Sequence, residues 1–398
     1  MKTFNFPLEI LKDWNEKINI EKFSQNRQII TLKDILSSKE FQETDFILPM
    51  AIGMKTDGKP YIADLTKMPH LLIVGKPGNG TSVLLDAILT SLLYSKKPDE
   101  VKFVLIDPDM VAFTHYNNVD IPYLAKNPAI DESEVSDIKD IYATLHSLCV
   151  EMNKRYKLLL ESSSRNLKEY NAGISNGKTD LSKFPVLPYI VVMIDRYESP
   201  IMTAGKEIEK PILMLAQKGR AVGIHLILST YRPTSEFISP AIGANFPARI
   251  TFKLDTEQER KLIIDQAGAE CLKGRGDMLV CHSYPTERVQ GAYIDYTEIE
   301  QICEYISKLP NDGKPYFLPE VHYEQIERPE EHADYLLKDC ALYMLETKLV
   351  SISAIQRNFH IGYNRATKII DQLQKAGVIS SRPRAMLLSK EEIEKLLS

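Results

Sequence analysis

Between about residues 67 and 308, short apolar runs alternate with longer segments of helical periodicity, and this alternation limits the possible folds more than any other feature. The runs expected to be strands are LLIVG, KFVLID, YIVVMID, IHLILST and ARITFKL, at 71–75, 102–107, 189–195, 224–230 and 248–254. Segments 82–95, 138–162 and 209–223 place apolar residues three and four positions apart, as helices do. Strands alternating with helices predict an α/β fold: a parallel sheet covered on both faces.

Four segments are expected along the chain. Residues 1–66 are a less regular α/β module that precedes the core at 67–308, and residues 309–332 are proline-containing and aperiodic, as in a linker. Residues 333–398 form a small helical unit. Its helices are expected at 336–348, 351–359 and 363–377, followed by a strand, turn and strand at 378–389. Three helices and a hairpin in this order predict a winged helix, a variant of the helix-turn-helix.

Composition excludes several classes of protein. A net charge of −5 over 398 residues argues against a chain that coats nucleic acid along its whole surface, although a local basic patch is compatible with it. The five cysteines include no CxxC pair, so neither a zinc site nor a disulfide framework is indicated. The apolar runs are too short to span a bilayer, and the N-terminus lacks the layout of a signal peptide. No membrane segment and a cytoplasmic location are therefore expected.

The stretch LLIVGKPGNGTSVLL, at 71–85, has the form of a phosphate-binding loop between a strand and a helix. Such loops surround phosphates with backbone N–H groups, and the helix N-terminus adds its dipole. Gly75 and Gly80 have the spacing of G-x-x-x-x-G-K-[ST], but Thr81 stands where that motif has lysine. The alternative is a tight turn without function. The predicted nucleotide-binding residues are Gly75, Lys76, Pro77, Gly78, Asn79, Gly80, Thr81 and Ser82.

An aspartate follows the apolar strand at 189–194, as in a Walker B motif. Asp195 and Ser82 are therefore the predicted ligands of Mg²⁺. The next residue is Arg196, and a guanidinium cannot accept a proton from water at neutral pH. The candidate catalytic positions Thr81, Asp195 and Arg196 thus form a degenerate set.

The C-terminal unit is locally basic. Between Lys348 and Arg384 there are seven basic residues and one acidic residue, a net charge of +6 in a chain that is acidic overall. Basic residues on a recognition helix contact phosphates and guanine edges, so this stretch predicts binding to double-stranded DNA. The alternative is a solvated charged face.

Several blocks occur together and in order, and they resemble the cytosolic motor of the FtsK/SpoIIIE family of DNA translocases. They are KMPHLLIVGKPGNGTS, KFVLIDPD, EMNKRYKLLLESSSRNLKEYN, LPYIVVMIDRYESPIMTAGKEIE, LAQKGRAVGIHLILSTYRP, DQAGAECLKGRGDML and SISAIQRNFHIGYNRATKIIDQLQKAGVI, within residues 45–385. The resemblance implies a RecA-like P-loop NTPase core that assembles as a ring, usually a hexamer, around DNA. It also implies ATP and Mg²⁺ as cofactors and a C-terminal winged helix, the gamma domain, that reads short sequences.

The resemblance also locates candidate DNA contacts. It places Asn364 and Arg365 at base-reading positions, and Arg382 and Arg384 on the wing near the phosphate backbone. The full predicted DNA-binding set is Arg357, Asn364, Arg365, Lys368, Arg382 and Arg384.

Four or five departures from the family pattern lie near the nucleotide. The uncertain one is the family's candidate trans-acting arginine, whose position falls on Lys261 in RKLIID, with Arg260 one residue early. The family has lysine at the positions of Thr81 and Asp109, glutamate at Arg196 and glutamine at Tyr231. The blocks that build the fold are intact, whereas random decay would have damaged them too. Each of the lost catalytic groups typically contributes a few kcal/mol, so a turnover several powers of ten lower is expected.

Substitute cations are an open alternative. Lys76, the second residue of the loop, either supplies the missing charge or is a solvated surface lysine. Arg196 either supplies charge or pairs with Asp109, if neighbouring strand ends bring the two together.

Three functions remain open on these grounds. The first is a DNA-binding family member with impaired or absent ATP hydrolysis, a pseudoenzyme in chromosome or mobile-DNA handling that forms rings alone or with an active relative. The second is an active ATP-driven translocase for chromosome segregation in cell division, completed by substitute cations. The third is a scaffold that binds only protein within ring assemblies. Whether the chain is an enzyme depends on hydrolysis at this degenerate site.

Overall fold

The computed structural model divides the chain into two compact units, Met1–Gln325 and Ile326–Ser398. It describes residues 5–12, 29–130, 135–176, 183–264, 266–282, 285–309, 315–323, 326, 336–359, 361–380 and 385–396. The first unit contains the predicted core, and the second contains the predicted winged helix.

A nine-stranded sheet is the centre of the first unit, with the order β2-β1-β10-β9-β8-β3-β7-β6-β4. Its strands are β1 (Pro49–Lys55), β2 (Pro60–Asp64), β3 (His70–Val74), β4 (Val101–Ile106), β6 (Tyr189–Ile194), β7 (Ile224–Thr230), β8 (Ala248–Thr251), β9 (Asp277–Cys281) and β10 (Glu287–Gly291). All five strands expected from the apolar runs are present. They form the parallel half, β8-β3-β7-β6-β4.

The other half of the sheet is antiparallel and was not predicted. Strand β9 pairs with β8 and β10, and β1 pairs with β10 and β2, in each case antiparallel. Strands β1 and β2 come from the segment expected to be a separate N-terminal module. Residues 1–66 are thus part of the same compact unit and extend the sheet of the core.

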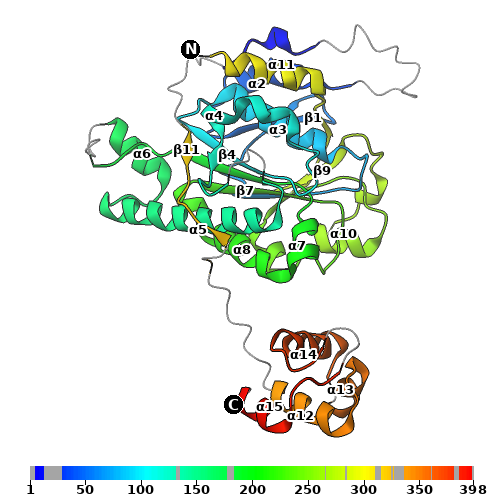
Figure 1. Cartoon of the computed structure of the whole chain (residues 1–398). Helices are drawn as coiled ribbons and strands as arrows, with labels where there is room; N and C mark the ends of the chain where they lie inside the picture. Colours follow the sequence, from blue (N-terminus) through cyan, green and yellow to red (C-terminus); the bar gives the residue numbers. More distant parts are fainter. Residues whose placement is uncertain are drawn as a thin grey trace. The chain divides into compact units, whose positions relative to one another are not determined.

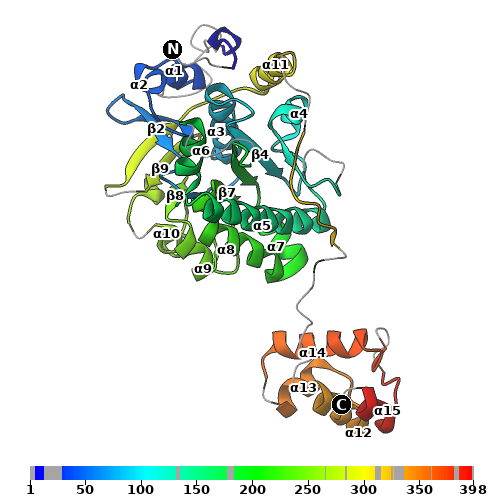
Figure 2. The same cartoon turned by 90° about the vertical axis from the view of Figure 1, so that its left-hand side faces the viewer.

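Helices cover both faces of the sheet, as predicted. Figures 1 and 2 show α5, α7 and α8 on one face, and α3 and α4 on the other. The helices are α1 (Leu32–Leu36), α2 (Lys39–Gln42), α3 (Thr81–Ser95), α4 (Asp120–Tyr123), α5 (Ile138–Glu161), α6 (Leu167–Ser175), α7 (Glu198–Ala204), α8 (Glu209–Lys218), α9 (Pro240–Asn245), α10 (Glu257–Ile263) and α11 (Tyr296–Ser307). Among the residues described, no helix is long and apolar enough to cross a membrane.

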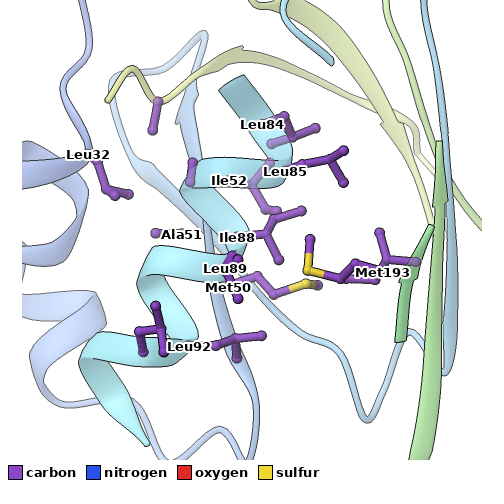
Figure 3. Packing of buried hydrophobic residues seen from close by; sticks show 14 of the residues in the cluster. Leu32, Met50, Ala51, Ile52, Leu84, Leu85, Ile88, Leu89, Leu92 and Met193 are labelled. Atoms are coloured by element: carbon purple, nitrogen blue, oxygen red, sulfur yellow. The ribbon is translucent and has the colours of Figure 1, made fainter. Parts of the chain in front are cut away.

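Helix α3 lies inside the unit rather than on its surface. Leu85, Ile88 and Leu92 are fully buried, and α3 packs against β1. Figure 3 shows its leucines and isoleucine among Met50 and Ile52 of β1 and Met193 of β6. Because nearly all sides of α3 are buried, including most of its polar residues, the helix is held on several sides. This packing fixes the helix that begins directly after the glycine loop.

Part of the predicted linker belongs to the first unit. Strand β11 (Tyr316–Phe317) pairs in parallel with β5 (Ala125–Lys126) in a small separate sheet. The hydroxyl of Tyr316 accepts a hydrogen bond from the buried Arg155 at 3.0 Å and donates one to Glu151 at 2.9 Å. The boundary between the compact units falls at residue 325, inside the segment 309–332.

The second unit has its own core. Helices α12 (Leu337–Thr347), α13 (Ile352–Phe359) and α14 (Tyr363–Lys375) match the three predicted helices, and α15 (Lys390–Leu396) follows them. Ile355, Ile369, Leu373 and Val378 are fully buried together. An antiparallel bridge joins Ile379 to Met386, where the predicted hairpin lies.

Candidate functional site

The candidate site lies at the carboxyl ends of four neighbouring parallel strands. Strand β3 leads into the glycine loop, β7 into Tyr231, β6 into Asp195 and Arg196, and β4 into the loop that carries Asp109. These strands are adjacent in the order β3-β7-β6-β4. Ligands of open α/β sheets bind at this edge, because the loops after parallel strands meet there.

The glycine loop has a backbone that only glycine adopts easily. Gly78 and Gly80 have φ angles of 80° and 113°. A Cβ on Gly75 would lie 2.8 Å from the Phe252 ring, and one on Gly80 would lie 3.1 Å from the amide nitrogen of Gly276. That amide donates a hydrogen bond to the carbonyl of Asn79, at 2.8 Å. The loop is therefore supported from the side by residues 274–276.

Thr81 begins helix α3 and is almost fully buried, with 3% of its surface exposed. Its hydroxyl oxygen has no hydrogen-bond partner among the described residues. The same oxygen would lie 2.9 Å from a Cβ on Gly75, so it faces the first glycine of the loop. Gly80, the N-cap of α3, provides no side-chain cap. The first turn of α3 thus keeps its capacity to bind an anion.

Lys76 is bound within its own chain. Its Nζ lies 2.6 Å from Asp255 Oδ2 and 3.4 Å from Glu259 Oε1. The hydrogen bond that Lys76 donates to Asp255 is the main cause that raises the pKa of Lys76. Of the two interpretations of Lys76, a free cation available to a phosphate is therefore the less favoured. Pro77 beside it is exposed.

Asp195 is held in a buried polar pocket. Ser229 donates a hydrogen bond to its carboxylate and accepts one from the backbone N–H of Arg196, at 3.1 Å. Burial raises the pKa of the Asp195 carboxyl to about 6, against the opposing effect of the Ser229 hydrogen bond. The contact with Ser229 was not predicted. The signal that could have found it is the position of Ser229 as the penultimate residue of the neighbouring strand β7.

Arg196 forms an ion pair with Asp109. This is one of the two roles that the sequence left open for Arg196, the other being a substitute cation in the site. Strands β4 and β6 pair in parallel, so the loops that follow them are neighbours. The Arg196 guanidinium also lies over the Tyr231 ring, 5.1 Å from its centroid, and Arg196 has a φ angle of 48°. Cations are attracted to the face of an aromatic ring at this distance.

Tyr231 connects this ion pair to the glycine loop. Its hydroxyl shares a hydrogen bond with the Ser82 hydroxyl, at 3.0 Å, and its backbone N–H donates to Glu198 at 3.1 Å. The contacts therefore run from Asp109 through Arg196 and Tyr231 to Ser82. We call these four residues the polar chain. Three of them stand at positions where the sequence was expected, from the family resemblance, to depart from the family pattern, and the sequence predicted only the first of the contacts.

Two matches of the sequence to family models decide the identification. The model described as the FtsK/SpoIIIE family matches residues 31–235, which is more than half of the chain. The chain belongs to the FtsK/SpoIIIE family. The model of the FtsK gamma domain matches residues 331–388, which include the three helices of the predicted winged helix.

Relatives in the family are similar over nearly the whole chain. A DNA translocase FtsK from Haemophilus influenzae is 38% identical over 391 residues, covering 91% of this chain and 72% of the relative. The DNA translocase SpoIIIE of Bacillus subtilis is 36% identical, covering 96% of this chain and 48% of the relative. The chain spans about half the length of most of the curated relatives it matches.

Solved structures of other proteins share the fold. The conjugation coupling protein TcpA of pCW3 matches with a TM-score of 0.57 and 23% identity, covering 70% of this chain and 75% of TcpA. The type VII secretion ATPase EccC of Thermomonospora curvata matches with a TM-score of 0.62 and 19% identity, covering 74% of this chain and 36% of EccC. The RecA-like P-loop core with a C-terminal winged-helix gamma domain is thereby confirmed.

Most of the predicted DNA contacts in the gamma domain lie outside what the structure describes. Arg382 and Arg384 fall in 381–384, and the side chains of Asn364, Arg365 and Lys368 on α14 are likewise not described. Arg357 is described: it is exposed near the end of α13, and its Nε donates to the Ser353 carbonyl at 3.2 Å. The DNA-binding set therefore stays a prediction.

Proposed function

We propose that this chain is a double-stranded-DNA-binding member of the FtsK/SpoIIIE family that retains the motor architecture but hydrolyses ATP poorly or not at all. It acts in chromosome or mobile-DNA handling, in rings of its own copies or mixed with an active relative. The observation that carries the proposal is the ion pair of Arg196 with Asp109. The residue after Asp195 is therefore a cation that is paired with an acid. An ATP-hydrolysing motor needs a group at this position that accepts a proton from water.

The glycine loop is proposed to hold the nucleotide passively. Its backbone amides and the N-terminus of α3 suit phosphate groups, and this α/β core also occurs in TcpA, whose solved structure contains ATPγS. Thr81 brings no ammonium group to the phosphates, and the water-activating group is missing. Each such loss is typically worth a few kcal/mol, and about 1.4 kcal/mol is tenfold in rate.

Steady-state phosphate release, with and without double-stranded DNA, tests the proposal. The unaltered chain is expected to release phosphate several powers of ten more slowly than a motor. Thr81→Lys with Arg196→Glu is expected to raise the rate, with Arg220→Glu as a control, because it changes the same charge at the opposite end of the sheet. Turnover by the unaltered chain at a motor's rate would refute the proposal.

An active translocase with substitute cations is the second candidate, and the exposed third of the Arg196 side chain favours it. Lys76 supports it less, since Asp255 and Glu259 already hold its ammonium group. The same ATPase assay separates the two candidates. A DNA titration at several salt concentrations separates both from a purely protein-binding scaffold, because phosphate contacts make affinity fall with salt.

A further inference from the structure

The residues predicted to hold Mg²⁺ already have other partners. The Ser82 hydroxyl is hydrogen-bonded to the Tyr231 hydroxyl at 3.0 Å, and the Asp195 carboxylate accepts from Ser229. A magnesium ligand must direct a lone pair at the ion in near-ideal octahedral geometry. Beside a nucleotide, Mg²⁺ is usually held by one or two protein side chains together with phosphate oxygens and waters, so the partners of Ser82 and Asp195 decide the fit. These residues do not fit Mg²⁺ well.

The positive charge of Arg196 also argues against Mg²⁺ at Ser82. The Arg196 guanidinium lies over one face of the Tyr231 ring, and the hydroxyl of that ring reaches Ser82. A divalent cation at Ser82 would therefore share this strand edge with the Arg196 guanidinium, and like charges repel, although Asp109 offsets part of that repulsion. In the same place, a phosphate would meet an attractive charge.

Two independent features indicate that an anion still binds. Helix α3 is 15 residues long and begins after a glycine N-cap without a side-chain cap. Thr81 is only 3% exposed, and its hydroxyl has no partner among the described residues and lies next to Gly75 of the loop. A buried hydroxyl without a partner is costly, and a phosphate oxygen would satisfy it.

We infer that the loop binds a nucleoside triphosphate without a divalent cation, with the Arg196 guanidinium in place of the metal. The amides of residues 78–82 and the Thr81 hydroxyl hold the phosphates. Asp109 and Tyr231 both orient Arg196, and a guanidinium with five N–H groups has further donors for phosphate oxygens. This inference rests on the proposed function, in which the loop holds a nucleotide without hydrolysing it. It adds that Arg196 is the group that offsets the negative charge of the phosphates.

Calorimetric titration of the full chain with ATPγS, once in excess Mg²⁺ and once in excess EDTA, tests the inference. The two dissociation constants are expected to agree within about threefold. A constant at least about tenfold lower in Mg²⁺ would overturn the inference, as would the absence of binding in both buffers.

Two variants assign the effect to residues. Arg196→Gln is expected to weaken ATPγS binding in EDTA by about tenfold or more, because it removes charge-assisted hydrogen bonds. Arg220→Gln is the matched control: it removes the same charge at the other end of β7 and is expected to bind as the unaltered chain does. Tyr231→Gln releases Ser82 and is expected to make binding tighter in Mg²⁺ than in EDTA. Unchanged binding by Arg196→Gln in EDTA would contradict the inference.

The two proposals fail separately. Phosphate release measured on the same preparations tests turnover, whereas ATPγS titration tests only equilibrium binding. Rapid hydrolysis combined with metal-independent ATPγS binding would refute the proposed function and leave this inference standing. Slow hydrolysis combined with strictly Mg²⁺-dependent ATPγS binding would refute this inference and leave the proposed function standing. Thermal unfolding of each variant shows whether a loss of binding reflects a loss of folding.

Discussion

At the scale of single residues, the substitutions around the loop depend on one another. Arg196 alone would place an unpaired cation at the strand end, but Asp109 neutralises it and the Tyr231 ring lies beneath it. Tyr231 in turn gives the Ser82 hydroxyl a partner. Residues that decay at random do not acquire matching charges and hydrogen bonds. The polar chain is therefore an alternative packing of the site rather than damage to it.

A charge reversal tests the Arg196–Asp109 ion pair. Arg196→Glu should lower the free energy of unfolding, because it sets a third carboxylate beside Asp109 and Asp195. Adding Asp109→Lys should recover most of that loss by restoring an opposite pair. The side chains are about one-third exposed, so the coupling energy from urea unfolding should be ~1 kcal/mol or less. Strictly additive effects of the two substitutions would show that the pair contributes nothing.

Buried histidines give the fold a pH dependence at the opposite end of the sheet. Burial lowers the pKa of His70 to about 3 and of His225 to about 4. Because the folded values lie below the unfolded one, the stability they contribute is complete above about pH 6.5 and is lost as pH falls towards 4.

His225→Asn removes this titration and keeps a donor for the Pro69 carbonyl, which His225 Nδ1 contacts at 2.9 Å. From pH 6.5 to 4.5 the unaltered chain should lose up to ~1.4 kcal/mol more per pH unit than the variant, by urea unfolding. His322→Asn, at a half-exposed surface histidine, should follow the unaltered chain. Equal losses for His225→Asn and the unaltered chain would exclude His225 as a cause.

At the scale of elements, the loop keeps its shape through its neighbours as well as its own glycines. The segment 274–276 packs beside it, and Gly276 donates to the Asn79 carbonyl. Helix α3 is buried on several sides, so the start of the helix cannot shift to relieve strain. The loop is therefore a rigid feature of this fold even without its lysine.

Two glycine substitutions separate strain from crowding. Gly78→Ala adds a side chain at a φ angle of 80° with no atom within 4 Å, so it should cost ~1–2 kcal/mol from backbone strain alone. Gly80→Ala adds strain at a φ angle of 113° and a close approach to the Gly276 amide, so it should cost more. Urea unfolding of both variants measures the difference. A Gly80→Ala protein as stable as Gly78→Ala would mean that residues 274–276 move aside freely.

The attachment of β11 to α5 is a second element-scale contact that can be tested. Tyr316→Phe removes hydrogen bonds to Arg155 and Glu151, which remain bonded to each other at 2.8 Å. The loss should be ~1–3 kcal/mol of unfolding free energy, since both partners are charged. Tyr305→Phe, on the exposed side of α11, should change it little. Equal losses of unfolding free energy in Tyr316→Phe and Tyr305→Phe would show that the hydrogen bonds of Tyr316 do not hold β11.

At the scale of the whole molecule, charge is divided between the parts. The chain is acidic overall, whereas residues 348–384 have a net charge of +6. A basic region in an otherwise acidic protein directs nucleic acid to one part and away from the rest. The two units thus differ in their proposed tasks: the first forms the motor core, and the gamma domain selects the DNA.

Arg365→Ala tests that division. It should weaken binding to a preferred duplex by ~1–3 kcal/mol and reduce the preference over a scrambled duplex, because a base contact is lost. Competition binding at fixed salt measures both quantities. Lys390→Ala, on α15 outside the basic stretch, should leave the preference unchanged. A preference that survives Arg365→Ala would remove Arg365 from the reading surface.

The sequence alone determined the parallel core, the loop and the helices of the gamma domain, because buried strands and amphipathic helices leave periodic apolar patterns. It also located Asp195 and Arg196, which directly follow such a strand. It missed β1, β2, β9 and β10, whose pairing is antiparallel and whose apolar signal is interrupted. It also missed β11, since two residues carry no periodicity.

Only the tertiary structure decided how the substituted residues relate. Tyr231 and Ser82 are separated by 149 positions, and Arg196 and Asp109 by 87. The strand order β3-β7-β6-β4 brings all four to one edge of the sheet. No local pattern encodes strand order, because it depends on which strands bury one another's faces across the whole unit. The sequence therefore indicated which positions carry unexpected residues, and the fold showed that these residues contact one another.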